Sequence, residues 1–116
     1  SRTRPSMLKI TEILNQIVDN IATILAEDTP EGIELWGLLI QQHPADIAMI
    51  ISKLEQDNQI KLCKKLPNEL RGIVFEKIPS ILQAELLVKF NTDEAAFIMK
   101  TLHADDLIDL FEHLSD

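Results

Sequence analysis

The chain has 116 residues, of which 46% are hydrophobic and 26% are charged, a size and composition typical of one compact domain. Its net charge of −8 repels phosphate and anionic lipid headgroups, which argues against a nucleic-acid partner. The single cysteine, Cys63, excludes an internal disulfide framework and a multi-thiolate zinc site, so we expect a reducing, cytoplasmic setting. No apolar stretch approaches the roughly 20 residues that cross a bilayer, so we expect no direct membrane insertion by this chain.

The first 42 residues predict a lead-in and two helices. Residues 1–7, which include Arg2, Arg4 and Pro5, are expected to be disordered. From residue 8 to residue 27 the apolar side chains recur in steps of three and one, which predicts one long amphipathic helix. Thr29 can cap a second helix over 30–42, and Pro30 suits its first turn. With three glycines and no tyrosine, the chain offers little material for a sheet, and the predicted class is all-α.

An internal repeat begins at His43. Residues 43–114 divide into six blocks of twelve, and positions 8, 9 and 12 of every block are apolar. This spacing of i, i+1 and i+4 gives each block one buried edge on a short helix. Position 8 holds Ile50, Leu62, Val74, Leu86, Ile98 and Leu110; position 9 holds Ile51, Cys63, Phe75, Leu87, Met99 and Phe111; position 12 holds Leu54, Leu66, Ile78, Phe90, Leu102 and Leu114.

Each block is expected to be one helix followed by a tight turn. Prolines and acidic residues gather where blocks begin, and lysines stand at position 11 of four blocks, as the helix dipole favours. A helix of about nine residues is unstable alone in water, so these helices must stack on one another. We therefore predict a right- or left-handed superhelix, an α-solenoid of about eight helices. Because the last block ends in the apolar residues Phe111 and Leu114 without a polar closing helix, we expect more protein after Asp116.

No enzyme motif is present: the chain lacks a glycine-rich phosphate loop, H-E-x-x-H and G-x-S-x-G. We therefore predict that it is not an enzyme. His43 and His103 both stand first in their blocks, which favours a structural role at a helix start over a ligand role. Cys63 falls on an apolar position, and Trp36 lies among leucines, so both are expected in the core.

Acidic residues are concentrated at the C-terminal end. Residues 91–116 contain seven acidic residues against one lysine, a net charge of −6. Within the last predicted helix Asp105, Asp106 and Asp109 are spaced so that Asp109 shares a face with either of the others. Such hard oxygen ligands suit Mg²⁺ or Ca²⁺. The alternative interpretation is a solvated, acidic helix start with no metal.

Three segments carry a family resemblance. HPADIAMIISKL, KKLPNELRGIVFEKI and HADDLIDLFEHL resemble the cytosolic N-terminal domain of MgtE-type magnesium transporters, and the likeness covers Leu8 to Leu114, best from His43 onward. The resemblance implies a superhelical domain over 8–116 at the cytoplasmic face of the inner membrane. It also implies the domains that follow in the family, a pair of CBS domains and a transmembrane pore that forms a homodimer. The implied role is to sense Mg²⁺ and to favour the closed pore when the ion is plentiful.

The resemblance also implies ligands. In the family, Mg²⁺ bridges this domain and the CBS domains through carboxylates at the start of the helix that corresponds to Asp105–Asp109. We carry over Asp105 first, then Asp109, with Asp106 as a weaker candidate. In the third block the family can supply a glutamate where this chain has Ile73. Glu69 and Glu76 on the same helix are the weaker candidates to replace it.

Two assembly roles are alternatives to an ion sensor. The flagellar motor switch protein FliG has short helical repeats with similar His-Pro openings and L-P-x-E-L turns, and it acts in protein assembly. A generic α-solenoid scaffold would bind a peptide in a groove, and a basic partner peptide would identify it.

Overall fold

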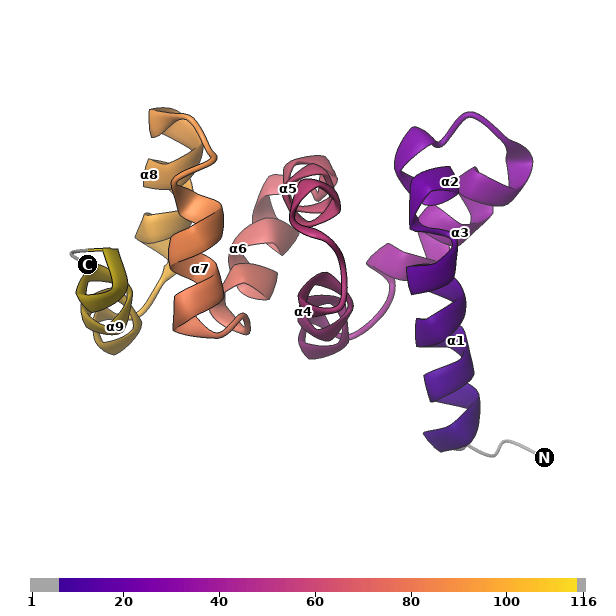
Figure 1. The fold of residues 1–116 in the computed structure, drawn as a ribbon, viewed down its shortest axis with the longest axis horizontal. Coiled ribbons are helices and arrows are strands. Elements are labelled where there is room, and N and C mark those ends of the chain that lie inside the picture. Colours follow the sequence, from indigo (N-terminus) through magenta and orange to yellow (C-terminus); the bar gives the residue numbers. More distant parts are fainter. Residues whose placement is uncertain (1–6, 115–116) are drawn as a thin grey trace. The chain divides into compact units, whose positions relative to one another are not determined.

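The computed structural model describes residues 7–114, and within them the chain forms nine α-helices and no strand (Figure 1). This confirms the predicted all-α class. The chain divides into two compact units, residues 1–42 and residues 43–116, each described by itself below. Residues 1–6 of the expected disordered lead-in lie outside the described residues, and Met7 begins the first helix.

The first unit contains α1 (Met7–Asp19), α2 (Ile21–Ala26) and α3 (Pro30–Ile40). Instead of one helix over 8–27, the structure has two that meet at Asn20, where φ is −109° and ψ is 20°. The Asn20 side chain donates a 2.8 Å hydrogen bond from Nδ2 to the Gln16 carbonyl. The same carbonyl also accepts the Asn20 backbone amide at 3.1 Å, so the local hydrogen bonding typical of asparagine accompanies the break.

The helix α3 begins as its sequence predicts. The Thr29 Oγ1 accepts a 3.0 Å hydrogen bond from the Gly32 amide, and Pro30 occupies the first turn. Gly32 is also where α3 lies close to α2, because a Cβ atom added there would lie 2.5 Å from the Thr23 carbonyl oxygen. The absence of a side chain at residue 32 therefore permits the packing of α2 against α3.

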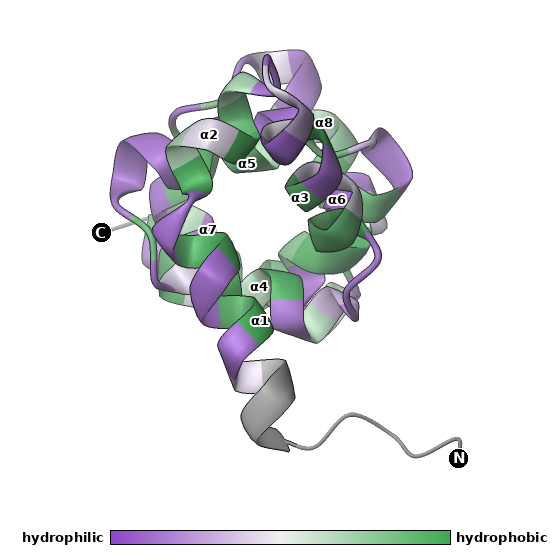
Figure 2. Ribbon diagram, turned by 90° about the vertical axis from the view of Figure 1, so that its right-hand side faces the viewer, coloured by the Kyte–Doolittle hydropathy of each residue, from purple (hydrophilic) through white to green (hydrophobic). Residues whose placement is uncertain are grey.

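The second unit contains one helix in each twelve-residue block. Each helix begins at the second position of its block, and in the first five blocks it ends before the apolar residue at position 12. In Figure 2 hydrophobic and hydrophilic residues occur side by side along the helices. The helices are α4 (Pro44–Ser52), α5 (Gln56–Lys65), α6 (Asn68–Glu76), α7 (Ser80–Leu87), α8 (Thr92–Thr101) and α9 (Ala104–Leu114).

Alternate helices of the second unit stack on one another. The helix α4 packs against α6, α6 packs against α8, and α7 packs against α9, as in a solenoid of stacked helices. All six residues at position 8 are at most 1% exposed, so this position forms the continuous core of the stack. Position 9 is buried in the first four blocks, but Phe111 in the last block is 53% exposed.

A second polar repeat connects each early helix to the one before it. Position 5 of the second, third and fourth blocks holds Gln59, Arg71 and Gln83, and each side chain donates to the backbone carbonyl of position 9 in the preceding block. The three donor–acceptor distances are 2.9, 2.7 and 2.7 Å. These bonds join each helix to the C-terminal end of the helix before it, where carbonyls lack i+4 partners. The carbonyls of Ile51 and Phe75 also accept a backbone amide three residues later, at 3.1 Å in both cases.

Candidate metal site on the last helix

The carboxylates predicted to bind metal stand at the beginning of α9. Asp105 and Asp106 lie in its first turn, and Asp109 follows one turn later. Asp105 and Asp109 are exposed, whereas Asp106 is half-buried. The side chains of Asp105 and Asp109 are four residues apart and therefore lie on one edge of the helix, open to solvent.

Comparison of the six blocks shows which of these acids the helix dipole explains and which it does not. Position 3, where Asp105 stands, also holds Asp57, Glu69 and Asp93 in other blocks, as the positive end of a helix dipole favours. Asp109 stands at position 7, in the middle of its helix, where the dipole gives an acid no advantage. The matching residue is Lys61 in α5 and Glu85 in α7, so the repeat itself does not fix the charge at this position. The helix dipole therefore accounts for Asp105 but not for the pair.

The two weaker candidates lie on α6 in different surroundings. Glu69 is exposed in the first turn. Glu76 is the last residue of α6, and its Oε1 lies 3.4 Å from Nε2 of His103. Between them Ile73 is 48% exposed, so an apolar side chain occupies the surface between the two glutamates.

The described residues bring no three metal-ligating groups together. Within residues 7–114 no group of three or more histidine, cysteine, aspartate or glutamate side chains is placed to hold a metal ion. The contact of Glu76 with His103 brings α6 to the residue that precedes α9, two positions before Asp105. The carboxylates of Asp105 and Asp109 fit one or two positions in the shell of a Mg²⁺ ion that keeps several waters.

The remaining candidate side chains have structural surroundings. His43 caps α4, because its Nδ1 accepts a 3.1 Å hydrogen bond from the Ala45 amide. Cys63 is 1% exposed, and burial raises the pKa of its thiol from 9.0 to about 12. Trp36 is half-buried in α3. These observations confirm the structural interpretation of His43 and the core position of Cys63.

The sequence comparison decides the family. The model of the MgtE intracellular N domain matches residues 42–116, about two thirds of the chain. The chain belongs to this family. The match covers all six blocks of the second unit, and it confirms the resemblance from His43 onward. No curated protein and no solved structure matches the chain.

Membership of the MgtE N domain family has direct consequences. The chain is an intracellular domain of an MgtE magnesium transporter, and the family is regulatory rather than enzymatic. Among the described residues no helix is long and apolar enough to span a membrane. The position-5 donors Gln59, Arg71 and Gln83 escaped the sequence analysis, although their recurrence every twelve residues was a signal that could have revealed them.

Proposed function

We propose that this MgtE N domain senses Mg²⁺ at the cytoplasmic face of the membrane and favours the closed pore when the ion is abundant. Asp105 and Asp109 are the principal ligands, and Asp106 is a weaker one. The proposal rests on one observation: Asp105 and Asp109 lie exposed on one edge of α9. The helix dipole does not explain an acid at Asp109, which stands in the middle of the helix. Two carboxylates make an incomplete cation site, which suits a site shared with a second domain.

The sensing follows from electrostatics. An acidic edge of this domain and an acidic surface of the adjacent CBS domains repel each other, and a divalent cation between them supplies the opposite charge. The compact arrangement therefore binds the ion better than the separated one. The Mg²⁺ concentration then sets the population of the compact state, which we assign to the closed pore of a homodimeric transporter.

The edge of α6 makes a weaker contribution. Glu69 has the exposed first-turn position that Asp105 has on α9, but Ile73 interrupts the edge one turn later. The Oε1 atom of Glu76 lies 3.4 Å from Nε2 of His103, and this contact makes Glu76 less available as a ligand. We therefore expect α9 to dominate the binding.

A relaxation experiment on the chain itself tests this assignment. Mn²⁺ replaces Mg²⁺ at oxygen sites and broadens the resonances of nearby amides. We expect the strongest broadening over residues 105–109, and an Asp105→Asn/Asp109→Asn variant should lose it. The matched control is Asp57→Asn, the same substitution at the equivalent position of α5. Broadening centred elsewhere, or unchanged in the double variant, would contradict the assignment.

A further inference from the structure

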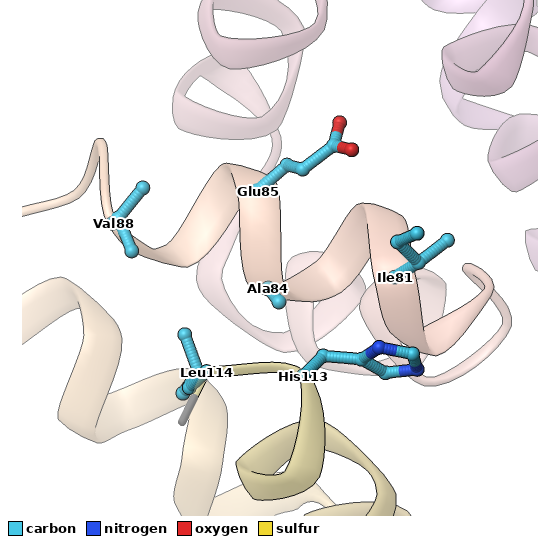
Figure 3. Close-up of a pocket in the computed structure, with 6 residues that line it drawn as sticks. All are labelled: Ile81, Ala84, Glu85, Val88, His113 and Leu114. Carbon is cyan, nitrogen blue, oxygen red and sulfur yellow. The ribbon is translucent and has the colours of Figure 1, made fainter. Parts of the chain in front are cut away.

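An open groove lies between α7 and α9, away from the position-8 core (Figure 3). Its volume is about 370 Å³, at the low end of ligand pockets. Three of its lining residues lie in α7, one directly follows that helix, and two lie at the end of α9: Ile81, Ala84, Glu85, Val88, His113 and Leu114. Ile81 and Val88 are 58% and 65% exposed, unusually high for large apolar side chains that line one groove.

The repeat provides an internal control for this groove. The equivalent positions on α5 and in the block of α7 carry charged residues: Asp57 corresponds to Ile81, Lys64 to Val88, and Lys89 to His113. There the Lys64 ammonium lies 6.0 Å from the centroid of the Phe90 ring, and Phe90 is the residue that corresponds to Leu114. The helix α6, which packs against α8, also carries charged residues at the positions of Ile81 and Val88, namely Glu69 and Glu76, so stacking of helices does not require apolar residues here. Their presence between α7 and α9 needs another explanation.

We propose that the groove between α7 and α9 binds an amphipathic helix of a partner protein that carries lysine or arginine beside its apolar face. Two packed helices offer a helix-shaped groove, and the described residues contain no sheet edge for an extended peptide. Glu85 lies in the lining, and residues 91–116 carry a net charge of −6. A basic helix meets this charge favourably.

The same charge disfavours other occupants. A second copy of the chain would bring two regions of −6 together, and an anionic lipid surface would be repelled. The groove is open along its length, whereas small-molecule sites enclose most of the ligand surface. A basic amphipathic helix is the occupant that satisfies both the apolar lining and the acidic surroundings.

The test replaces two lining residues by the residues at the equivalent positions of the α5 block. In Ile81→Asp/Val88→Lys the groove receives the residues of the equivalent positions, both on exposed sites. The probe is a leucine–lysine amphipathic helical peptide, titrated calorimetrically without divalent cations. We expect the double variant to bind at least tenfold more weakly while its circular dichroism and melting temperature stay unchanged. The control Ile33→Asp, at a residue 54% exposed in the first unit, should bind as the unaltered chain does.

Three results would overturn the proposal. One is that the double variant binds the peptide as tightly as the unaltered chain does. Another is that the unaltered chain binds a peptide of the same composition, with its leucines no longer on one helical face, as tightly as the amphipathic peptide. The third is self-association of the chain, seen by sedimentation and abolished in the double variant, because the occupant would then be a second copy. None of these results depends on Mg²⁺, so they leave the ion-sensing proposal unaffected.

Discussion

A Cβ atom added to Gly72 would lie 2.9 Å from both Cγ2 and Oγ1 of Thr101, so α6 and α8 pack together here because residue 72 has no side chain. Helix interiors otherwise favour alanine over glycine by about 1 kcal/mol. The glycine in α6 is therefore explained by tertiary packing. The stacking of alternate helices depends on such close contacts as well as on the apolar core.

Gly72→Ala should lower the free energy of unfolding by about 1–3 kcal/mol, since the new methyl group must displace a short, β-branched side chain. Gly37→Ala is the control, because nothing lies within 4 Å of an added Cβ there, and it should stabilise by about 0.5–1 kcal/mol. Urea denaturation measures both. Adding Thr101→Ala to the first variant should restore part of the loss, and equal effects at the two glycines would show that the contact is unimportant.

Arg71 should be the most costly of the position-5 donors to replace. Its Nε donates to the Cys63 carbonyl at 2.7 Å, and its Nη2 donates to the Lys64 and Leu66 carbonyls at 2.7 and 3.0 Å. We expect Arg71→Met to lower the free energy of unfolding by about 2 kcal/mol, and Arg71→Lys by a smaller amount, because an ammonium lacks the planar fork. Lys61→Met on the exposed face of α5 should change it by less than about 0.5 kcal/mol. Equal stability of all three variants would contradict the assigned role.

Cys63 should be unreactive in the folded chain. Burial raises the pKa of its thiol from 9.0 to about 12, and the charge of Arg71 offsets only part of this effect. At pH 8 the reaction with a disulfide reagent should therefore follow the rate of unfolding. The folded state keeps a proton that the unfolded state loses, so this contribution to stability is complete below pH 9.0 and falls as pH rises toward about 12. Between those values Cys63→Ala should show a shallower loss of stability, and rapid labelling of the folded chain would refute the prediction.

Ile73→Glu should strengthen cation binding on α6. The new carboxylate would lie one turn from both Glu69 and Glu76, giving three acids on one edge, and Ile73 is exposed enough for the change to leave folding intact. We expect Mn²⁺ to bind this edge roughly threefold to tenfold more tightly. Met49→Glu is the matched control, because the equivalent edge of α4 offers only Asp46. Equal gains in both variants would indicate a general effect of charge rather than a site.

Much of the second unit could be predicted from its sequence, because the repeat, the caps and the apolar positions all indicate the same short helices. Position 8 is buried throughout, as the periodicity predicts. The same reasoning was incomplete at position 9, since Phe111 is apolar but 53% exposed. Burial there depends on a later helix covering the residue, which a pattern within one block does not encode.

The periodicity of apolar residues does not predict features that depend on side-chain hydrogen bonds. The apolar steps run through Asn20 without interruption, but the expected helix is divided in two at this residue, whose side chain donates to the Gln16 carbonyl. Gln59, Arg71 and Gln83 look like surface residues in the sequence, although the two glutamines are 7% and 2% exposed. Their hydrogen bonds join neighbouring blocks, so their role emerges only when the helices are placed together. The acids of α9 were predictable as a cluster, whereas the function proposed for them involves a second domain.

The central claim is that Asp105 and Asp109 transmit the Mg²⁺ concentration to the pore. The most direct measurement is Mg²⁺ flux through the full-length transporter at low and high internal Mg²⁺, in the unaltered protein, in Asp105→Asn/Asp109→Asn and in the control Asp57→Asn. The account predicts that only the double variant continues to conduct at high internal Mg²⁺, with flux at low Mg²⁺ unchanged in all three. Closure of the double variant at the same Mg²⁺ concentration as the unaltered protein would contradict it.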